Sequence, residues 1–131
     1  MSSRVVIVDD DDEMRLLIAA MLRIRLPAEI VGQGTNGDEA VELAAELRPD
    51  VLVLDHVMPV RYGGDAVADI RQASPETCIV MFSATILYAV NLGDGAGASV
   101  PDRFVSKADG LVGLHVAIQE CLDERQSAAG G

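Results

Sequence analysis

Two short and wholly apolar runs of the chain each end in aspartate. Residues 51–54 (Val-Leu-Val-Leu) are followed by Asp55, and residues 5–8 (Val-Val-Ile-Val) are followed by Asp9 and Asp10. Runs of this kind are typical of parallel strands that are buried on both faces, and such sheets bind ligands beyond the carboxyl ends of their strands. We therefore expect a parallel sheet whose ligand-binding edge carries three carboxylates.

The three aspartates predict a binding site for a divalent cation. Like charges about 4 to 5 Å apart repel by roughly 3 to 4 kcal/mol per pair at an effective dielectric constant of about 20, so a bare cluster raises the pKa values of its own members. A cation relieves this repulsion, and a ligand set made only of oxygens favours Mg²⁺ over zinc or copper. Because Mg²⁺ held by a few carboxylates also takes up phosphate oxygens, the expected chemistry is phosphoryl transfer.

Length and charge narrow the class of protein further. A chain of 131 residues fits one domain with a core that needs no disulfide or structural metal. Ten basic and 21 acidic residues give a net charge of −11, which argues against direct binding of nucleic acid and of anionic membranes. The partner face is therefore expected to be basic or apolar.

The cysteines and the amino terminus indicate the compartment. Cys78 and Cys121 have neither CxxC spacing nor a disulfide framework around them, so we expect two reduced thiols in the core. No apolar stretch reaches the roughly 18 residues of a membrane span, and residues 9–13 are acidic where a signal peptide needs its apolar segment. We expect a cytoplasmic protein without membrane insertion.

Strand and helix patterns alternate along the whole chain. Helical spacing of apolar residues stops before each of Pro27, Pro49 and Pro75, and short apolar runs resume after them. The predicted strands are residues 4–8, 30–32, 51–54, 78–82 and 104–106, and the apolar faces of the predicted helices are within residues 14–22, 40–47, 67–70, 86–92 and 111–122. This order predicts an α/β fold, a doubly wound (βα)5 unit with a five-stranded parallel sheet and helices on both faces.

Two further polar residues end strands at the edge that carries the aspartates. Ser83 follows the fourth predicted strand and Lys107 follows the fifth. A hydroxyl donates one hydrogen bond, and a lysine supplies a compact positive charge that suits phosphate oxygens. We expect both side chains to meet a phosphoryl group at the acidic edge.

Together these motifs resemble the receiver domain of two-component response regulators. The resemblance rests on Asp9-Asp10, on residues 54–59 with Gly63, on Ser83-Ala84 and on residues 104–107, and it covers nearly all of residues 4–125. It implies a flavodoxin-like, CheY-like sheet with strand order 2-1-3-4-5. It also implies a receiver domain over residues 1–126, which leaves residues 127–131 as a flexible tail or linker stub.

The resemblance assigns a role to each residue of the acidic edge. Asp55 would be the phosphoacceptor, a nucleophile toward a phosphohistidine of a sensor histidine kinase or phosphotransfer protein, or toward a small phosphodonor. Asp10, Asp55 and the backbone carbonyl of Val57 would ligate Mg²⁺, and Asp9 would act through water or as a further ligand. Lys107 would offset the phosphoryl charge together with the metal.

The resemblance also implies how phosphorylation changes the surface. Ser83 would move toward the phosphoryl group, and Phe104 would change rotamer as it does so. The altered face would be the helix from Ile86, the strand at Phe104 and the last helix, which is used for a homodimer or for a downstream protein target or output domain. The chain would catalyse only its own phosphorylation and dephosphorylation, and so is not expected to be an enzyme for other substrates.

Two positions depart from the common receiver pattern, and a glycine-rich stretch is open to two interpretations. Ala108 follows Lys107 where many receivers have proline, which leaves the geometry of that peptide bond open. Val57 is apolar where a polar side chain would handle the attacking water, which predicts slow autodephosphorylation. The glycines within residues 93–97 fit either a mobile element of the output face or a loop insertion without a role.

Other interpretations remain open at this point. A haloacid-dehalogenase-like phosphatase would use Asp9, Asp11, Ser83 and Lys107 but leaves Asp55 unexplained, and a flavodoxin-like cofactor binder would not place acidic residues in its first loop. A receiver-fold binding module that works without phosphorylation is the main rival. Taken singly, Asp9 fits a helix cap, Lys107 a surface charge, His56 an exposed loop residue, and Phe104 plain core.

Overall fold

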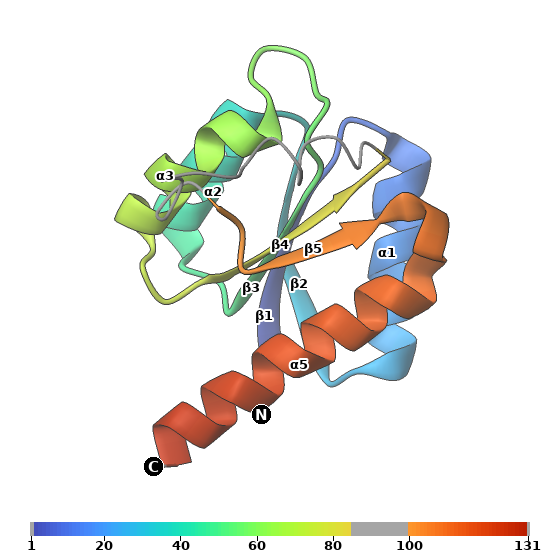
Figure 1. Cartoon of the computed structure of the whole chain (residues 1–131), viewed down its shortest axis with the longest axis vertical. Helices are drawn as coiled ribbons and strands as arrows, with labels where there is room; N and C mark the ends of the chain where they lie inside the picture. The colour runs from blue at the N-terminus through green and yellow to red at the C-terminus, as the bar shows by residue number, and fades with distance from the viewer. Residues whose placement is uncertain (1, 85–99, 131) are drawn as a thin grey trace.

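A computed structural model describes residues 2–84 and 100–130 of the chain (Figure 1). Its strands are β1 (Ser3–Val8), β2 (Ala28–Gly34), β3 (Val51–Leu54), β4 (Cys78–Ser83) and β5 (Arg103–Ser106). Its helices are α1 (Asp12–Arg25), α2 (Gly37–Leu47), α3 (Gly63–Ala73) and α5 (Gly110–Gly130), with a 3-10 turn at Lys107–Asp109. The helix predicted from Ile86 and the glycines of residues 93–97 lie outside the described residues.

The five strands form one parallel sheet in the order β2-β1-β3-β4-β5, which confirms the predicted topology. The register aligns Val8 with Leu54, Leu54 with Met81, and Ser83 with Ser106. All carboxyl ends therefore meet at one edge, where the residues that follow each strand become neighbours.

Helices cover both faces of the sheet and divide the core in two (Figure 1). Strand residues alternate in direction, so odd-numbered residues of β1 such as Val5 and Ile7 meet α1 and α5, whereas Val6 and Val8 meet α2 and α3. The α1/α5 side is closed by Ile18, Leu22, Leu114, Ile118 and Leu122, and the α2/α3 side by Ala40, Ala44, Met58, Val67 and Ile70. The aspartates that follow β1 and β3 lie at the end of the sheet, between the two helical layers.

Side chains cap the first two helices. Asp11 is the N-cap of α1 and accepts hydrogen bonds from the amides of Glu13 and Met14, while Asn36 caps α2 through the amide of Glu39. These caps fix where each helix leaves the loop above the sheet. In the described residues, no helix combines the length and the apolar character needed to cross a membrane.

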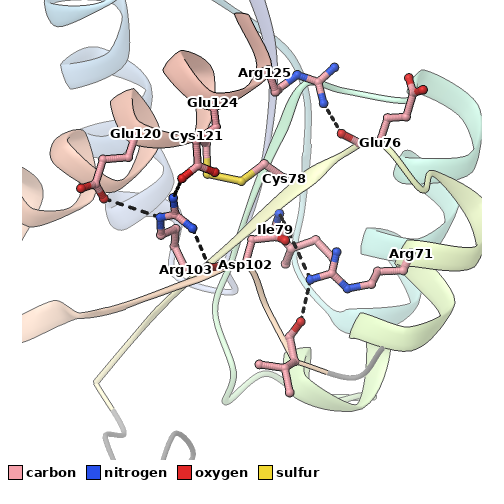
Figure 2. Close-up of a disulfide and its surroundings, with 11 residues drawn as sticks. Arg71, Glu76, Cys78, Ile79, Asp102, Arg103, Glu120, Cys121, Glu124 and Arg125 are labelled. Carbon is pink, nitrogen blue, oxygen red and sulfur yellow. Dashed lines mark hydrogen bonds and ion pairs between the residues drawn. A yellow bond between two sulfur atoms is a disulfide. The ribbon is translucent and has the colours of Figure 1, made fainter. Parts of the chain in front are cut away.

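The expectation of two reduced thiols was wrong, because Cys78 and Cys121 form a disulfide (Figure 2). They are 43 residues apart in sequence, but the start of β4 lies under α5 and brings their Cα atoms within 6.3 Å, inside the range that a disulfide spans. Sequence spacing could not predict this pairing, since only the packing of α5 on the sheet creates it.

The last helix is longer than its apolar face indicated. Its backbone is helical to Gly130, through residues 127–130 of the predicted tail. Alanine has the highest intrinsic helix propensity, which favours continuation of the helix through Ala128-Ala129.

Candidate functional site

Three carboxylates gather at the carboxyl edge of the sheet. Asp9 and Asp10 follow β1, Asp55 follows β3, and one oxygen of each lies within 4.8 Å of the others. Asp9 and Asp55 are only 2% and 6% exposed, whereas Asp10 is exposed to solvent. Two buried acids and one exposed acid thus form a cluster that is open to solvent on one side.

Lys107 is the cation that partners this cluster. Its Nζ donates to Oδ2 of Asp9 at 2.9 Å and lies 3.4 Å from Oδ2 of Asp55. The other oxygens of both acids are also engaged, because the amide of Asp11 donates to Asp9 and the amide of His56 donates to Asp55. Lys107 therefore connects β5 to the ends of β1 and β3.

The electrostatics of the cluster follow from burial and from like charge. Burial is the main cause that raises the pKa of Asp55, and the charge of Asp9 adds to it, while Lys107 and the amide of His56 act in the opposite direction. Burial by itself would lower the pKa of Lys107, but its hydrogen bond to Asp9 and the charges of both acids outweigh it, so that this pKa is raised. One lysine does not balance three carboxylates.

These residues fit a divalent cation with hard oxygen ligands. Asp10 and Asp55 approach one another from two strands, and a cation between them would relieve the repulsion among the three carboxylates. Asp9, whose two oxygens accept hydrogen bonds from the amide of Asp11 and from Lys107, lies beside Asp10 and Asp55. The roles of these ligands, and of the Val57 carbonyl, stay predictions.

Backbone packing holds the phosphoacceptor candidate in place. A Cβ atom on Gly63 would lie 1.8 Å from the backbone oxygen of Asp55, so only glycine fits there. The amide of Gly63 also donates to the carbonyl of His56 at 2.8 Å. The first turn of α3 is thus packed directly against the end of β3.

His56 takes over the capping of α3, which the N-cap residue Tyr62 does not perform. Its Nδ1 accepts a hydrogen bond from the amide of Gly64 at 3.1 Å, and its ring lies 5.3 Å from the ring of Tyr62. Burial lowers the pKa of His56, which favours the neutral ring that this acceptor role requires. His56 therefore lies in a loop, as its interpretation from the sequence expects, but it is partly buried rather than exposed.

Arg61 anchors the β3–α3 loop to both neighbouring helices. Its guanidinium group lies 2.6 Å from Asp69 and 3.5 Å from Asp38, and it donates to the carbonyl of Asp65. Its own carbonyl accepts from the amide of Gly37, at the start of α2. No sequence motif indicated this role, because it depends on the position of α2, which brings Asp38 and Gly37 to the loop.

Val60 has a left-handed backbone with φ of 69°, which is strained for a β-branched residue. We expect Val60→Gly to stabilise the chain by roughly 0.5 to 1 kcal/mol, because relief of this strain outweighs the greater freedom of glycine in the unfolded state. Urea unfolding monitored by circular dichroism measures the change. The control is Val57→Gly in the same loop, which is expected to destabilise; equal effects at both positions would refute the strain.

The remaining predicted residues lie where the strand register places them. Ser83 is the last residue of β4, 1% exposed and paired in register with Ser106, which precedes Lys107. Phe104 is partly buried and packs on the α2/α3 side of the core. Val57 is half exposed, and the peptide bond after Lys107 is trans. The switch roles of Ser83 and Phe104 stay predictions.

Comparison with known proteins adds a family match. The family model of the response regulator receiver domain matches residues 5–108. The chain is 39% identical over 84 residues to the chemotaxis protein CheY of Thermotoga maritima, a match that covers 64% of this chain and 69% of that protein. It is also 35% identical over 136 aligned positions to a protein-glutamate methylesterase/protein-glutamine glutaminase of Alkalilimnicola ehrlichii, which covers all of this chain but 34% of that protein.

A solved structure extends the likeness to the fold. The two-component response regulator of the LuxR family from Aurantimonas sp. SI85-9A1 superposes with a TM-score of 0.83 at 25% identity, over 95% of this chain and 87% of that one. The chain spans about a third of the length of the methylesterase relative, so the likeness to that protein concerns one part of it.

Proposed function

Because the chain belongs to the response regulator receiver domain family, we propose that it accepts a phosphoryl group on Asp55 in a two-component or phosphorelay system. The observation that supports this most is the buried carboxylate of Asp55, 3.4 Å from the Lys107 ammonium group and within 4.8 Å of two further acids. A structural aspartate would gain nothing from two neighbours of like charge, whereas a phosphoacceptor needs the cation that such a cluster attracts.

The proposed chemistry is a direct transfer. An oxygen of Asp55 forms a bond to phosphorus while the phosphorus–nitrogen bond of a phosphohistidine breaks, and the electron pair of that bond leaves with the imidazole. With acetyl phosphate the breaking bond is phosphorus–oxygen, and acetate leaves. The amide of His56 already donates to one oxygen of Asp55, which orients the carboxylate for this attack.

The charge on the phosphoryl oxygens must be balanced at the site. Mg²⁺, when bound to Asp10, Asp55 and the Val57 carbonyl, would supply positive charge to these oxygens. The Lys107 ammonium group supplies a second positive charge from the β5 side, since it already lies between Asp9 and Asp55. Its pairing with Asp55 would then be exchanged for pairing with the phosphoryl group.

A change at the site would reach the surface through β4 and β5. Ser83 ends β4 and pairs in register with Ser106 of β5. Phe104 lies two residues before Ser106 in the same strand. Movement of Ser83 toward the phosphoryl group would leave space for a new Phe104 rotamer, which alters the face formed by β5 and α5. That face would bind a downstream target, an output domain or a second copy of the chain.

The partners and location follow from the same proposal. The donor is a sensor histidine kinase or a phosphotransfer protein, and the acidic chain, with a net charge of −11, binds no nucleic acid itself. The protein is proposed to be cytoplasmic, without membrane insertion, and to catalyse only its own phosphorylation and dephosphorylation.

The test is incubation of the purified chain with acetyl phosphate and Mg²⁺, followed by intact mass measurement. We expect a gain of about 80 Da, the mass of one phosphoryl group, which is absent when EDTA replaces Mg²⁺. If Mg²⁺ binds but no mass is gained with acetyl phosphate or phosphoramidate, the chain is instead a receiver-fold binding module that works without phosphorylation.

The phosphoryl group is expected to be long-lived. Val57 is half exposed beside the site but has no polar atom to position the attacking water, so we expect a half-life of minutes or longer. Val57→Asn supplies an amide for that water and should shorten the half-life by about tenfold or more. The matched control is Val60→Asn, three residues further along the same loop. A half-life of seconds in the purified wild-type chain would refute the prediction.

A further inference from the structure

The disulfide joins the first residue of β4 to the second half of α5 (Figure 2). Cys121 is 1% exposed within the α1/α5 side of the core, whereas Cys78 is partly buried at the rim of that core. The chain has two cysteines and both are used, so this is its one covalent link between a helix and the sheet. The bond lies at the opposite end of β4 from Ser83.

Beyond the disulfide, α5 has few buried contacts with the rest of the chain. The exposure of α5 side chains is described as far as residue 127. Within that part Leu122 is the last buried residue, and residues 123–127 are exposed or partly exposed. The first half is different, because Leu114, Ala117 and Ile118 are all buried in the core. The buried attachments of the second half are therefore the disulfide and the neighbouring Leu122.

Polar contacts supplement this attachment at the surface, on both sides of the sulfur atoms (Figure 2). The Arg125 guanidinium group contacts Asp50 at 3.0 Å and the carbonyl of Glu76, and Arg103 on β5 pairs with Glu120 and Glu124. The carboxylates of Glu120 and Glu124 are more than half exposed. Exposed ion pairs of this kind contribute little to stability and are screened by salt.

We propose that Cys78 and Cys121 form a reversible thiol–disulfide exchange site that takes low-molecular-weight thiols, and that reduction loosens the second half of α5 from β4. Disulfides that occur in the cytosol are mostly transient or redox-sensing, and the partly buried Cys78 offers the more accessible sulfur. The consequence for signalling rests on the proposed function, since α5 would belong to the output face. The redox state would then change that face independently of phosphorylation.

The exchange balances in two steps. A thiolate of the small thiol attacks the Cys78 sulfur, which forms a mixed disulfide and releases the Cys121 sulfur as a thiolate that takes up a proton. A second small thiolate attacks the sulfur of the first small thiol in the mixed disulfide. This step releases the Cys78 thiolate and one molecule of small disulfide. The protein gains two electrons, and two small thiols are oxidised to one disulfide.

The first test equilibrates the purified chain in mixtures of reduced and oxidised glutathione and counts free thiols by alkylation and intact mass. We expect no labelled thiol in the oxidised mixtures, two in the reduced mixtures, and return to none on reoxidation. Two labelled thiols at every ratio would overturn the proposal. So would labelling that appears only when the chain is unfolded.

The second test measures amide hydrogen exchange in α5 of the oxidised and reduced chain. Amides from Cys121 onward are expected to exchange about tenfold faster or more after reduction, while those of α2 stay unchanged. The melting temperature should fall by about 8 to 15 °C, because the bond no longer restricts a 43-residue segment of the unfolded chain. A lower melting temperature with unchanged exchange in α5 would show a purely structural cross-link and overturn the proposal.

Variants separate redox chemistry from other effects of the reductant. Cys78→Ser combined with Cys121→Ala is expected to show the fast α5 exchange in every glutathione mixture. Should this variant fail to fold, the reduced wild-type chain provides the same comparison. Neither test uses a phosphoryl donor, so failure of phosphoryl uptake would refute the proposed function alone. A disulfide that glutathione does not reduce, or whose reduction leaves hydrogen exchange in α5 unchanged, would refute this inference alone.

Discussion

Replacement of Asp55 by asparagine is expected to abolish phosphoryl uptake from acetyl phosphate, with no mass gain of about 80 Da in the presence of Mg²⁺. Asparagine has nearly the same size and can still accept the hydrogen bond from the amide of His56. It loses the anionic oxygen that is proposed to attack phosphorus and one proposed ligand for the metal. The loss of uptake is therefore expected from the chemistry of the side chain and not from unfolding of the chain.

The same variant should be more stable than the wild-type chain without Mg²⁺. Burial and the charge of Asp9 raise the pKa of Asp55, so its ionised form is unfavourable in the folded state at neutral pH. Asparagine removes that charge, and urea unfolding should shift to a higher midpoint. A gain in stability with a loss of activity is what a functional residue under electrostatic strain produces.

The matched control is Asp12→Asn in the acidic run after β1, where the carboxylate is exposed and pairs with Arg15. This variant should take up one phosphoryl group as the wild-type chain does. If Asp55→Asn still gained about 80 Da, the phosphoacceptor would have to be Asp9 or Asp10, and tandem mass spectrometry of the modified peptide would identify it.

Gly63→Ala is expected to destabilise the chain by about 3 kcal/mol or more. The new Cβ atom would lie 1.8 Å from the backbone oxygen of Asp55 and 3.1 Å from Cγ of Leu54. Backbone oxygen cannot move aside without displacing the end of β3, so α3 must shift away from the sheet. This loss would be a large fraction of the stability of a folded domain, which is only about 5 to 15 kcal/mol.

The control for this substitution is Gly34→Ala at the end of β2. There the nearest atoms to a new Cβ are side-chain atoms of Leu43 and Glu39, at 3.1 and 3.2 Å, which can move by a few tenths of an ångström. Its cost is expected to be about 1 kcal/mol or less. Urea unfolding of both variants makes the comparison, and similar losses at the two glycines would contradict the contact between Gly63 and Asp55.

Short-range patterns predicted the sheet and its acidic edge well. The β3 strand was predicted with its observed bounds, because four consecutive apolar residues in front of Asp55 have few other places in a small α/β domain. The bounds of β2 and β5 were predicted too short, since their ends carry Gly34 and Arg103, which have little strand character of their own. Pairing with neighbouring strands extends them.

The surroundings of the site were much less predictable. The anchoring of Arg61, the cap that His56 provides and the left-handed backbone of Val60 all depend on where α2 and α3 lie relative to the β3–α3 loop. The Cys78–Cys121 bond depends likewise on α5. None of these features leaves a periodic signal in the sequence.

The sequence by itself therefore determined the order of the strands and helices, the parallel sheet and the acids at its carboxyl edge, because these depend on hydrophobic periodicity and on residues next to strand ends. Only the tertiary structure decided which acid pairs with Lys107, which carbonyl Gly63 packs against and which cysteines bond. The contacts of Lys107 and of the cysteines join residues that are far apart in the chain, and all three contacts are set by how the elements pack on the sheet rather than by any local preference.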